Sequence, residues 1–144
     1  MFAAEILIGL LVASAFYKFA ETGDWRIFYI PFVSFMFSSV LSFYLDVPRP
    51  FEAMGFEPLI PHCADGAFPS DHSSLAFGVA IAQNSPFLWV LAFVVASARV
   101  YAGIHWPIDV LGSLALVVAI NYLVQWLYEI GNKSSPRSKK RKAD

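Results

Sequence analysis

The sequence contains few charged residues. Asp, Glu, Lys and Arg make up 15% of its 144 residues, while 58% are hydrophobic and 17% are aromatic. A soluble globular domain carries about 25% charged residues, so this composition excludes an ordinary soluble domain and indicates an integral membrane protein. Cysteine is equally scarce. Cys63 is the one cysteine of the chain, which excludes an internal disulfide and leaves the redox compartment open.

Long apolar runs fill most of the chain. A membrane-spanning helix needs about 20 mostly apolar residues. Four segments approach this length, and a fifth is shorter. We therefore expect an all-α, polytopic transmembrane helix bundle of about five spans with a Pro-rich extracytoplasmic loop. The spans are expected at residues 2–19, 27–45, 71–85, 86–98 with an extension to about 103, and 107–128.

The basic residues gather at the C-terminus, where six of the ten lie in the last twelve residues. This polar run without an apolar period predicts a disordered tail at residues 131–144, after a membrane domain at residues 1–130. Because this tail follows a membrane span, we favour a role as a juxtamembrane anchor over a role in nucleic-acid binding. The positive-inside rule then places the tail in the cytoplasm. We expect a plasma (inner) membrane protein whose active site lies on the extracytoplasmic side.

The segment at residues 46–70 interrupts the apolar runs. It contains five prolines, which exclude a regular helix throughout. Its apolar residues suit the membrane interface. Two interpretations stay open, a surface loop that dips into the headgroups and an entrance for a lipid tail.

Three polar stretches fall on the same side of the predicted bundle. They contain His72 and His105, together with Arg49 and Arg99, and His62 lies between two of them on the same side. Ionisable residues at membrane depth are costly and usually mark function, and the guanidinium fork suits phosphate. Ser70 is placed to cap the helix expected from residue 71, and a helix N-terminus attracts phosphate. The stretches therefore predict an oxyanion site.

His105 and Asp109 are four residues apart at the start of the last expected span. On a helix that begins near His105 both side chains lie on one face, and Pro107 is tolerated in the first turn. The carboxylate can then accept a hydrogen bond from one ring nitrogen and raise the basicity of the other. This is the arrangement of a nucleophile and its orienting group.

Three motifs occur in a fixed order along residues 27–128. The first is "RP" at 49–50 and the second is "PSDH" at 69–72. The third consists of Arg99, His105 and Asp109. Together they resemble the signature motifs of the type 2 phosphatidic acid phosphatase superfamily. The stretch "LIPHCADGAFPSDHSS" is further similar to the undecaprenyl-diphosphate phosphatase branch of that superfamily.

The resemblance implies a membrane lipid phosphatase that needs no metal and no cofactor. His105 would attack phosphorus to form a phosphohistidine, oriented by Asp109, and His72 would protonate the leaving oxygen. The residues implied to hold the phosphate, partly through backbone N–H groups, are Arg49, Arg99, Ser70 and Asp71. The implied substrate is undecaprenyl diphosphate, with phosphatidic acid or phosphatidylglycerophosphate as alternatives.

The chain departs from the family pattern in three ways. Ser42 stands seven residues before Arg49, where the family usually has Lys, and Ala98 stands where it usually has Ser. The family core also commonly has six spans rather than five. A second copy of the chain could supply the missing surface, so a homo-oligomer is one interpretation.

Two other classes of function are weighed beside the enzyme. The missing Lys motivates a membrane protein that binds lipid phosphate without hydrolysing it, although such a binder would not need a nucleophile and its orienter. A zinc site is the second, because the ligand types are suitable. Its candidate ligands would be His62, Cys63, Asp65 and His72, but their spacing matches no closed structural site.

Overall fold

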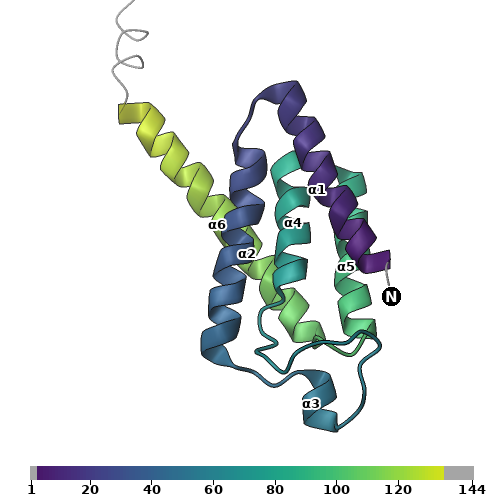
Figure 1. Cartoon of the computed structure of the whole chain (residues 1–144). Helices are drawn as coiled ribbons and strands as arrows, with labels where there is room; N and C mark the ends of the chain where they lie inside the picture. The colour runs from purple at the N-terminus through teal and green to yellow at the C-terminus, as the bar shows by residue number, and fades with distance from the viewer. Residues whose placement is uncertain (1–2, 135–144) are drawn as a thin grey trace, which may run out of the picture.

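The computed structural model describes residues 3–134, and all regular structure in this range is helical. Figure 1 shows five long helices and one short one. They are α1 (Ala3–Thr22), α2 (Arg26–Leu45), α3 (Pro50–Met54), α4 (Asp71–Gln83), α5 (Pro86–Tyr101) and α6 (Pro107–Ser134). The predicted all-α helix bundle is therefore confirmed.

The five long helices coincide with the five expected spans, apart from residue 2, which lies outside the described residues. Within residues 3–134, two helical segments could cross a membrane by length and composition, Arg26–Met54 and Pro107–Gly131, and the apolar helix Pro86–Tyr101 is shorter. The number of spans stays a prediction. α6 continues through Ser134, four residues into the expected tail, and the rest of that tail lies outside the described residues.

Helix α4 is the centre of the bundle and packs against α1, α2, α5 and α6 (Figure 1). Its small residues allow close approach, as in many membrane helix pairs. A Cβ atom at Gly78 would lie only 2.6 Å from the Cα atom of Pro31 in α2. The hydroxyls of Ser38 and Ser74 share a hydrogen bond of 2.6 Å across the same contact. Both features fix α2 against α4.

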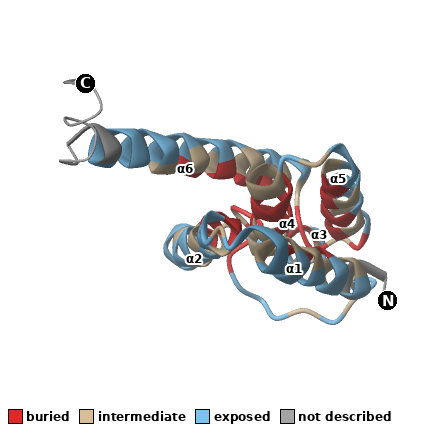
Figure 2. Cartoon of the chain, turned by 90° about the horizontal axis from the view of Figure 1, so that it is seen from above, coloured by how far each residue is buried: buried red, intermediate tan, exposed pale blue. Residues whose placement is uncertain are grey.

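The outward helix faces are apolar. Figure 2 shows red, buried residues concentrated in and around α4, while the outer faces are pale blue. Many of these exposed residues are large and hydrophobic, including Tyr17 at 68% and Phe43 at 76% exposure. A soluble monomer rarely leaves so much contiguous apolar surface uncovered, so these faces suit contact with lipid.

The polar loops gather at one end of the bundle. In Figure 1, α2 and α5 end there, α4 and α6 begin there, and the segment that carries α3 crosses the same end. Pro50 opens α3 and Gly55 ends it at a φ of 69°. This short helix was not expected among so many prolines. The topology brings the three polar stretches together, as the sequence predicted.

Candidate active site

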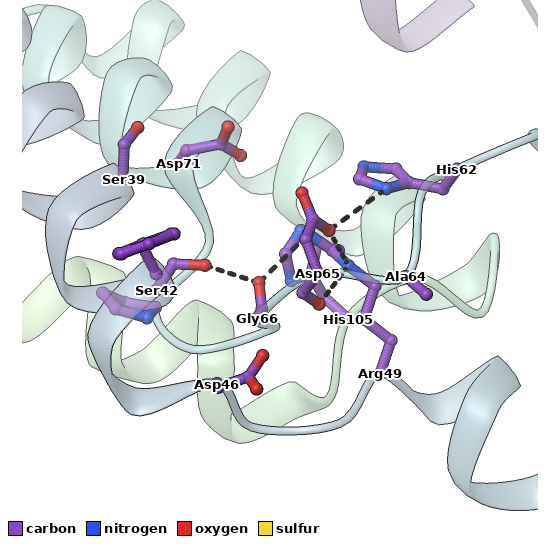
Figure 3. Close-up of a pocket in the computed structure, with 12 residues that line it drawn as sticks. Ser39, Ser42, Asp46, Arg49, His62, Ala64, Asp65, Gly66, Asp71 and His105 are labelled. Atoms are coloured by element: carbon purple, nitrogen blue, oxygen red, sulfur yellow. Dashed lines mark hydrogen bonds and ion pairs between the residues drawn. The ribbon is translucent and has the colours of Figure 1, made fainter.

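A cavity of about 560 Å³ lies at this end of the bundle. Figure 3 shows side chains that meet around it from α2, from the loops before α3, α4 and α6, and from the beginning of α4. The residues that line it are Ser39, Ser42, Phe43, Asp46, Arg49, His62, Ala64, Asp65, Gly66, Pro69, Asp71 and His105. Of the seven predicted site residues, three line this cavity directly.

His105 presents one ring nitrogen to the cavity side of the site. The residue is 2% exposed. Its Nδ1 lies 2.9 Å from the carbonyl oxygen of Ala67, and its Nε2 lies 3.3 Å from Nη1 of Arg49. A carbonyl can only accept and a guanidinium can only donate, so the proton belongs on Nδ1. Nε2 is left with a lone pair, as a nucleophile requires.

Asp109 lies beneath this imidazole and is fully buried. Its Oδ2 accepts from the backbone N–H of Trp106 at 2.7 Å and lies 3.4 Å from Nδ1 of His105. The structure thus brings the predicted pair together, but the Ala67 carbonyl is the nearer acceptor for the ring. Trp106 N–H would otherwise lack a partner at the start of α6, so Asp109 also fixes this helix end.

Burial lowers the pKa of His105 below its ordinary value, and the positive charges of Arg49 and Arg99 lower it further. The carboxylate of Asp109 acts in the opposite direction and only partly offsets these effects. His105 is therefore neutral near pH 7, with a lone pair on Nε2 that faces the Arg49 guanidinium.

Arg49 is 4% exposed and holds the cavity wall together. Its Nε donates to the Asp65 carboxylate at 2.8 Å, its Nη1 to the Ile104 carbonyl at 2.8 Å, and its Nη2 to the Gly66 carbonyl at 3.2 Å. The backbone N–H of Arg49 itself donates to Glu52 in α3. The planar fork is thus fixed in direction, with Nη1 beside the His105 ring.

Arg99 reaches the site through a histidine. It lies in the last turn of α5, is 3% exposed, and approaches His62 with 3.2 Å between Nη2 and Nε2. His62 in turn lines the cavity, whereas Arg99 is not among the residues that line it. Arg49 and Arg99 therefore contact neighbouring imidazoles at the same site.

The second motif begins α4. Ser70 is buried, and its hydroxyl accepts from the backbone N–H of Ser73 at 3.4 Å, which is the predicted cap. Its carbonyl accepts from the Ser113 hydroxyl of α6 at 2.8 Å. Asp71 lines the cavity and binds Nδ1 of His72 at 2.7 Å. His72 is therefore linked to the cavity through Asp71, without lining it.

The sequence analysis gave no phosphate-site role to His62 and Asp65. Both line the cavity, and His62 Nδ1 lies 3.7 Å from the Asp65 carboxylate, which also pairs with Arg49. They were weighed only as zinc ligands together with Cys63, whose side chain is exposed. Within residues 3–134, no three His, Cys, Asp or Glu side chains are placed to hold one metal ion. The sequence signal that could have indicated a site role is the three-residue spacing of His62 and Asp65 shortly before "PSDH".

Comparison with known proteins gives a consistent result. Residues 24–132 match the family model described as the PAP2 superfamily. The chain is 40% identical over 82 residues to "Undecaprenyl-diphosphatase BcrC" of Bacillus subtilis, an alignment that covers 53% of this chain and 42% of that protein. It is 45% identical over 74 residues to "Putative undecaprenyl-diphosphatase YbjG" of Escherichia coli, covering 46% and 37%.

A solved structure is also similar. It is a transmembrane PAP2-type phosphatidylglycerolphosphate phosphatase from Bacillus subtilis, with a TM-score of 0.63 and 26% identity over 93% of this chain and 73% of that one. The aligned regions span less than half the length of the two curated relatives. The helical fold, the apolar outer faces and this transmembrane neighbour identify an integral membrane protein.

Proposed function

Because the chain belongs to the PAP2 superfamily, we propose that it is a metal-independent lipid phosphatase that works through a phosphohistidine at His105. The observation that carries the proposal is the buried imidazole itself. Its Nδ1 faces the Ala67 carbonyl and Asp109, and its Nε2 lies beside Arg49 at the cavity. The site thus combines a nucleophile, the groups that orient it, and a cation that can stabilise the negative charge of the phosphoryl group in the transition state.

The first step is attack of the His105 Nε2 lone pair on phosphorus. A P–N bond forms while the P–O bond to the leaving group breaks, and the leaving oxygen takes a proton from His72. The hydrogen bond between Nδ1 of His72 and Asp71 leaves Nε2 of His72 as the nitrogen for this transfer. In the second step water attacks phosphorus and gives a proton to His72 while the P–N bond to His105 breaks. Inorganic phosphate and free His105 are released.

The phosphoryl oxygens need positive charge and N–H donors more than further covalent chemistry. Arg49 has five N–H groups, and its contacts with loop carbonyls fix the guanidinium at the cavity wall. Arg99 adds a second charge nearby. Ser70 and the first backbone N–H groups of α4 bring the positive end of a helix dipole toward the same place.

A second, apolar cavity supports a substrate with a lipid tail. It has a volume of about 350 Å³ and is lined by residues of α1, α2 and α4, including Phe35, Leu75 and Val79. Phe35 precedes Ser39 by one helical turn, and Leu75 follows Asp71 by one turn. Side chains four apart lie on one helix face, so the α2 and α4 faces lead from the polar cavity to the apolar one.

Among lipids, we propose undecaprenyl diphosphate as the substrate and undecaprenyl phosphate as the product. The support is the naming of two relatives as undecaprenyl-diphosphatases. Phosphatidylglycerophosphate is the alternative that the structural neighbour's title favours, and phosphatidic acid is the third candidate. We further propose that the site opens on the extracytoplasmic side of the plasma membrane, with the basic tail in the cytoplasm.

The test is phosphate release by the detergent-purified protein from each of the three lipids, in EDTA. The proposal predicts release from undecaprenyl diphosphate at the highest kcat/KM, and loss of release in His105→Ala. Release that requires added metal would contradict the metal-independent mechanism.

A protein that binds lipid phosphate without hydrolysis is the second candidate function. It is favoured by Ser42, whose hydroxyl donates to the Gly66 carbonyl where the family usually has a cation. This binder would retain undecaprenyl diphosphate on vesicles but release no phosphate, and His105→Ala would leave its binding unchanged. The phosphatase is preferred because a binder needs neither the nucleophile nor its buried carboxylate.

A further inference from the structure

The cavity lining contains more negative than positive charge. Three carboxylates line it, from Asp46, Asp65 and Asp71, against the single guanidinium of Arg49. Ser42 contributes a hydroxyl and no charge. A phosphate or diphosphate brings additional negative charge, so its binding calls for another cation at the wall.

Two imidazoles are the remaining titratable groups of this lining. His105 must stay neutral to act as the nucleophile, so it cannot supply the charge. His62 has no such constraint, and it is 20% exposed at its side chain. It contacts Arg99, lies within the field of the Arg49 charge and lines the cavity. It is therefore the lining group that can become positive without stopping the reaction.

The contacts of His62 define its state before substrate arrives. Nδ1 lies 3.2 Å from its neighbour's carbonyl oxygen, at Cys63, and Nε2 lies 3.2 Å from Nη2 of Arg99. The carbonyl requires a proton on Nδ1, and the guanidinium requires a lone pair on Nε2. The ring is therefore neutral in this arrangement. Burial lowers the pKa of His62, and the charges of Arg49 and Arg99 lower it further.

From this geometry we infer that His62 is a phosphate-binding residue that takes up a proton when the phosphate group of the substrate enters the cavity. It supplies the positive charge that Ser42 does not. The inference rests on the proposed function. The charged groups that face His62 are Arg49, Arg99 and Asp65, and a phosphate beside them reverses the net charge that keeps the ring neutral. Protonated Nε2 then donates to a phosphate oxygen instead of accepting from Arg99.

The experiment compares His62→Gln and His62→Lys with the natural protein, using undecaprenyl diphosphate hydrolysis in detergent. Gln keeps one acceptor for Arg99 and one donor for the carbonyl but never becomes charged, whereas Lys is always charged. Cys63→Ser is the matched control, because that exposed side chain is outside the site. One charge-assisted hydrogen bond is worth about ten- to hundredfold in affinity, so KM should rise by about that factor in His62→Gln, with a smaller change in kcat.

The pH dependence separates a charge from a merely structural role. As the pH rises above about 6.5, KM of the natural protein should rise, because His62 in the phosphate-bound protein loses its proton. In His62→Gln it should be high and nearly constant, and in His62→Lys low and nearly constant. Isothermal titration with inorganic phosphate, in buffers of different ionisation enthalpy, should show greater proton uptake by the natural protein than by His62→Gln.

Failure of the inference and failure of the proposed function look different. If the natural protein hydrolyses the lipid and His62→Gln keeps its KM, pH profile and proton uptake, the role of His62 is refuted while the phosphatase stands. A raised KM in both His62→Gln and His62→Lys, with the same dependence of KM on pH in each, would also refute the role of His62. That result would indicate a structural contact. If the natural protein neither releases nor binds phosphate, the proposed function itself fails.

Discussion

Replacement of Asp109 by Asn tests the link between the buried carboxylate and catalysis. Asn has the same shape, and its oxygen can still accept from the Trp106 backbone N–H, which the carboxylate now binds at 2.7 Å. The change removes one negative charge that lies 3.4 Å from Nδ1 of His105. In the free protein the ring is neutral, so this charge matters little for substrate binding. In the proposed mechanism the ring becomes positive when Nε2 bonds to phosphorus, and the carboxylate charge then stabilises it.

The size of the effect can be bounded from the structure. A lost hydrogen bond to a charged group costs about 1.5–3 kcal/mol. At 3.4 Å, the full Coulomb attraction with an effective dielectric constant of about 20 is about 5 kcal/mol. Since about 1.4 kcal/mol corresponds to a factor of ten, kcat should fall between about tenfold and a few thousandfold, with KM nearly unchanged.

Steady-state phosphate release, with kcat and KM measured separately, is the assay. Asp24→Asn is the matched control, because that carboxylate forms an exposed ion pair of 2.7 Å with Arg26 in the turn before α2. The control should keep its kcat. A fall in kcat of less than threefold in Asp109→Asn, or an equal fall in kcat and rise in KM, would refute this account of the carboxylate, provided the variant unfolds at the same temperature.

Three further results are expected. His72→Gln should lower kcat strongly for phosphatidic acid, whose leaving alkoxide needs a proton, but much less for p-nitrophenyl phosphate, whose leaving group needs little protonation; equal losses for both would contradict a general acid. Because burial and Arg49 lower the pKa of His105, attack needs no proton removal near neutrality, so the acid limb of kcat/KM should have its midpoint below about 6.5; a midpoint above that value would contradict the neutral nucleophile. Leu75→Trp, which fills the apolar cavity, should raise KM for long-chain lipids and leave hydrolysis of a short-chain phosphate unchanged, and equal effects on both would argue against a tail path.

Much of the fold could be predicted because helix periodicity and apolar length are local properties. The uncharged run at residues 27–45 became α2, and the run after Pro107 became α6. Pro50 is one of the five prolines that were expected to exclude a regular helix throughout residues 46–70. It instead begins the short helix α3, since proline is well suited to a first turn, where its missing N–H has no partner to lose.

The site was predictable where spacing alone decides the geometry. His105 and Asp109 are four positions apart in the sequence, and the structure places Nδ1 of His105 3.4 Å from Oδ2 of Asp109. Contacts to backbone carbonyls could not be predicted in the same way. The Ala67 carbonyl that faces the His105 ring comes from a loop distant in sequence, and loop paths depend on packing rather than on residue type. His62 was missed for a related reason, since only the fold brings it to Arg99.

The central claim is that phosphate is transferred through His105. Its most direct test is rapid-quench incubation with undecaprenyl diphosphate labelled at the terminal phosphate, followed by alkaline digestion conditions that preserve phosphohistidine and by peptide mapping. The account predicts label on the peptide that contains His105, with neither label nor phosphate release in His105→Ala. Label on a different residue, or phosphate release by His105→Ala at the natural rate, would contradict it.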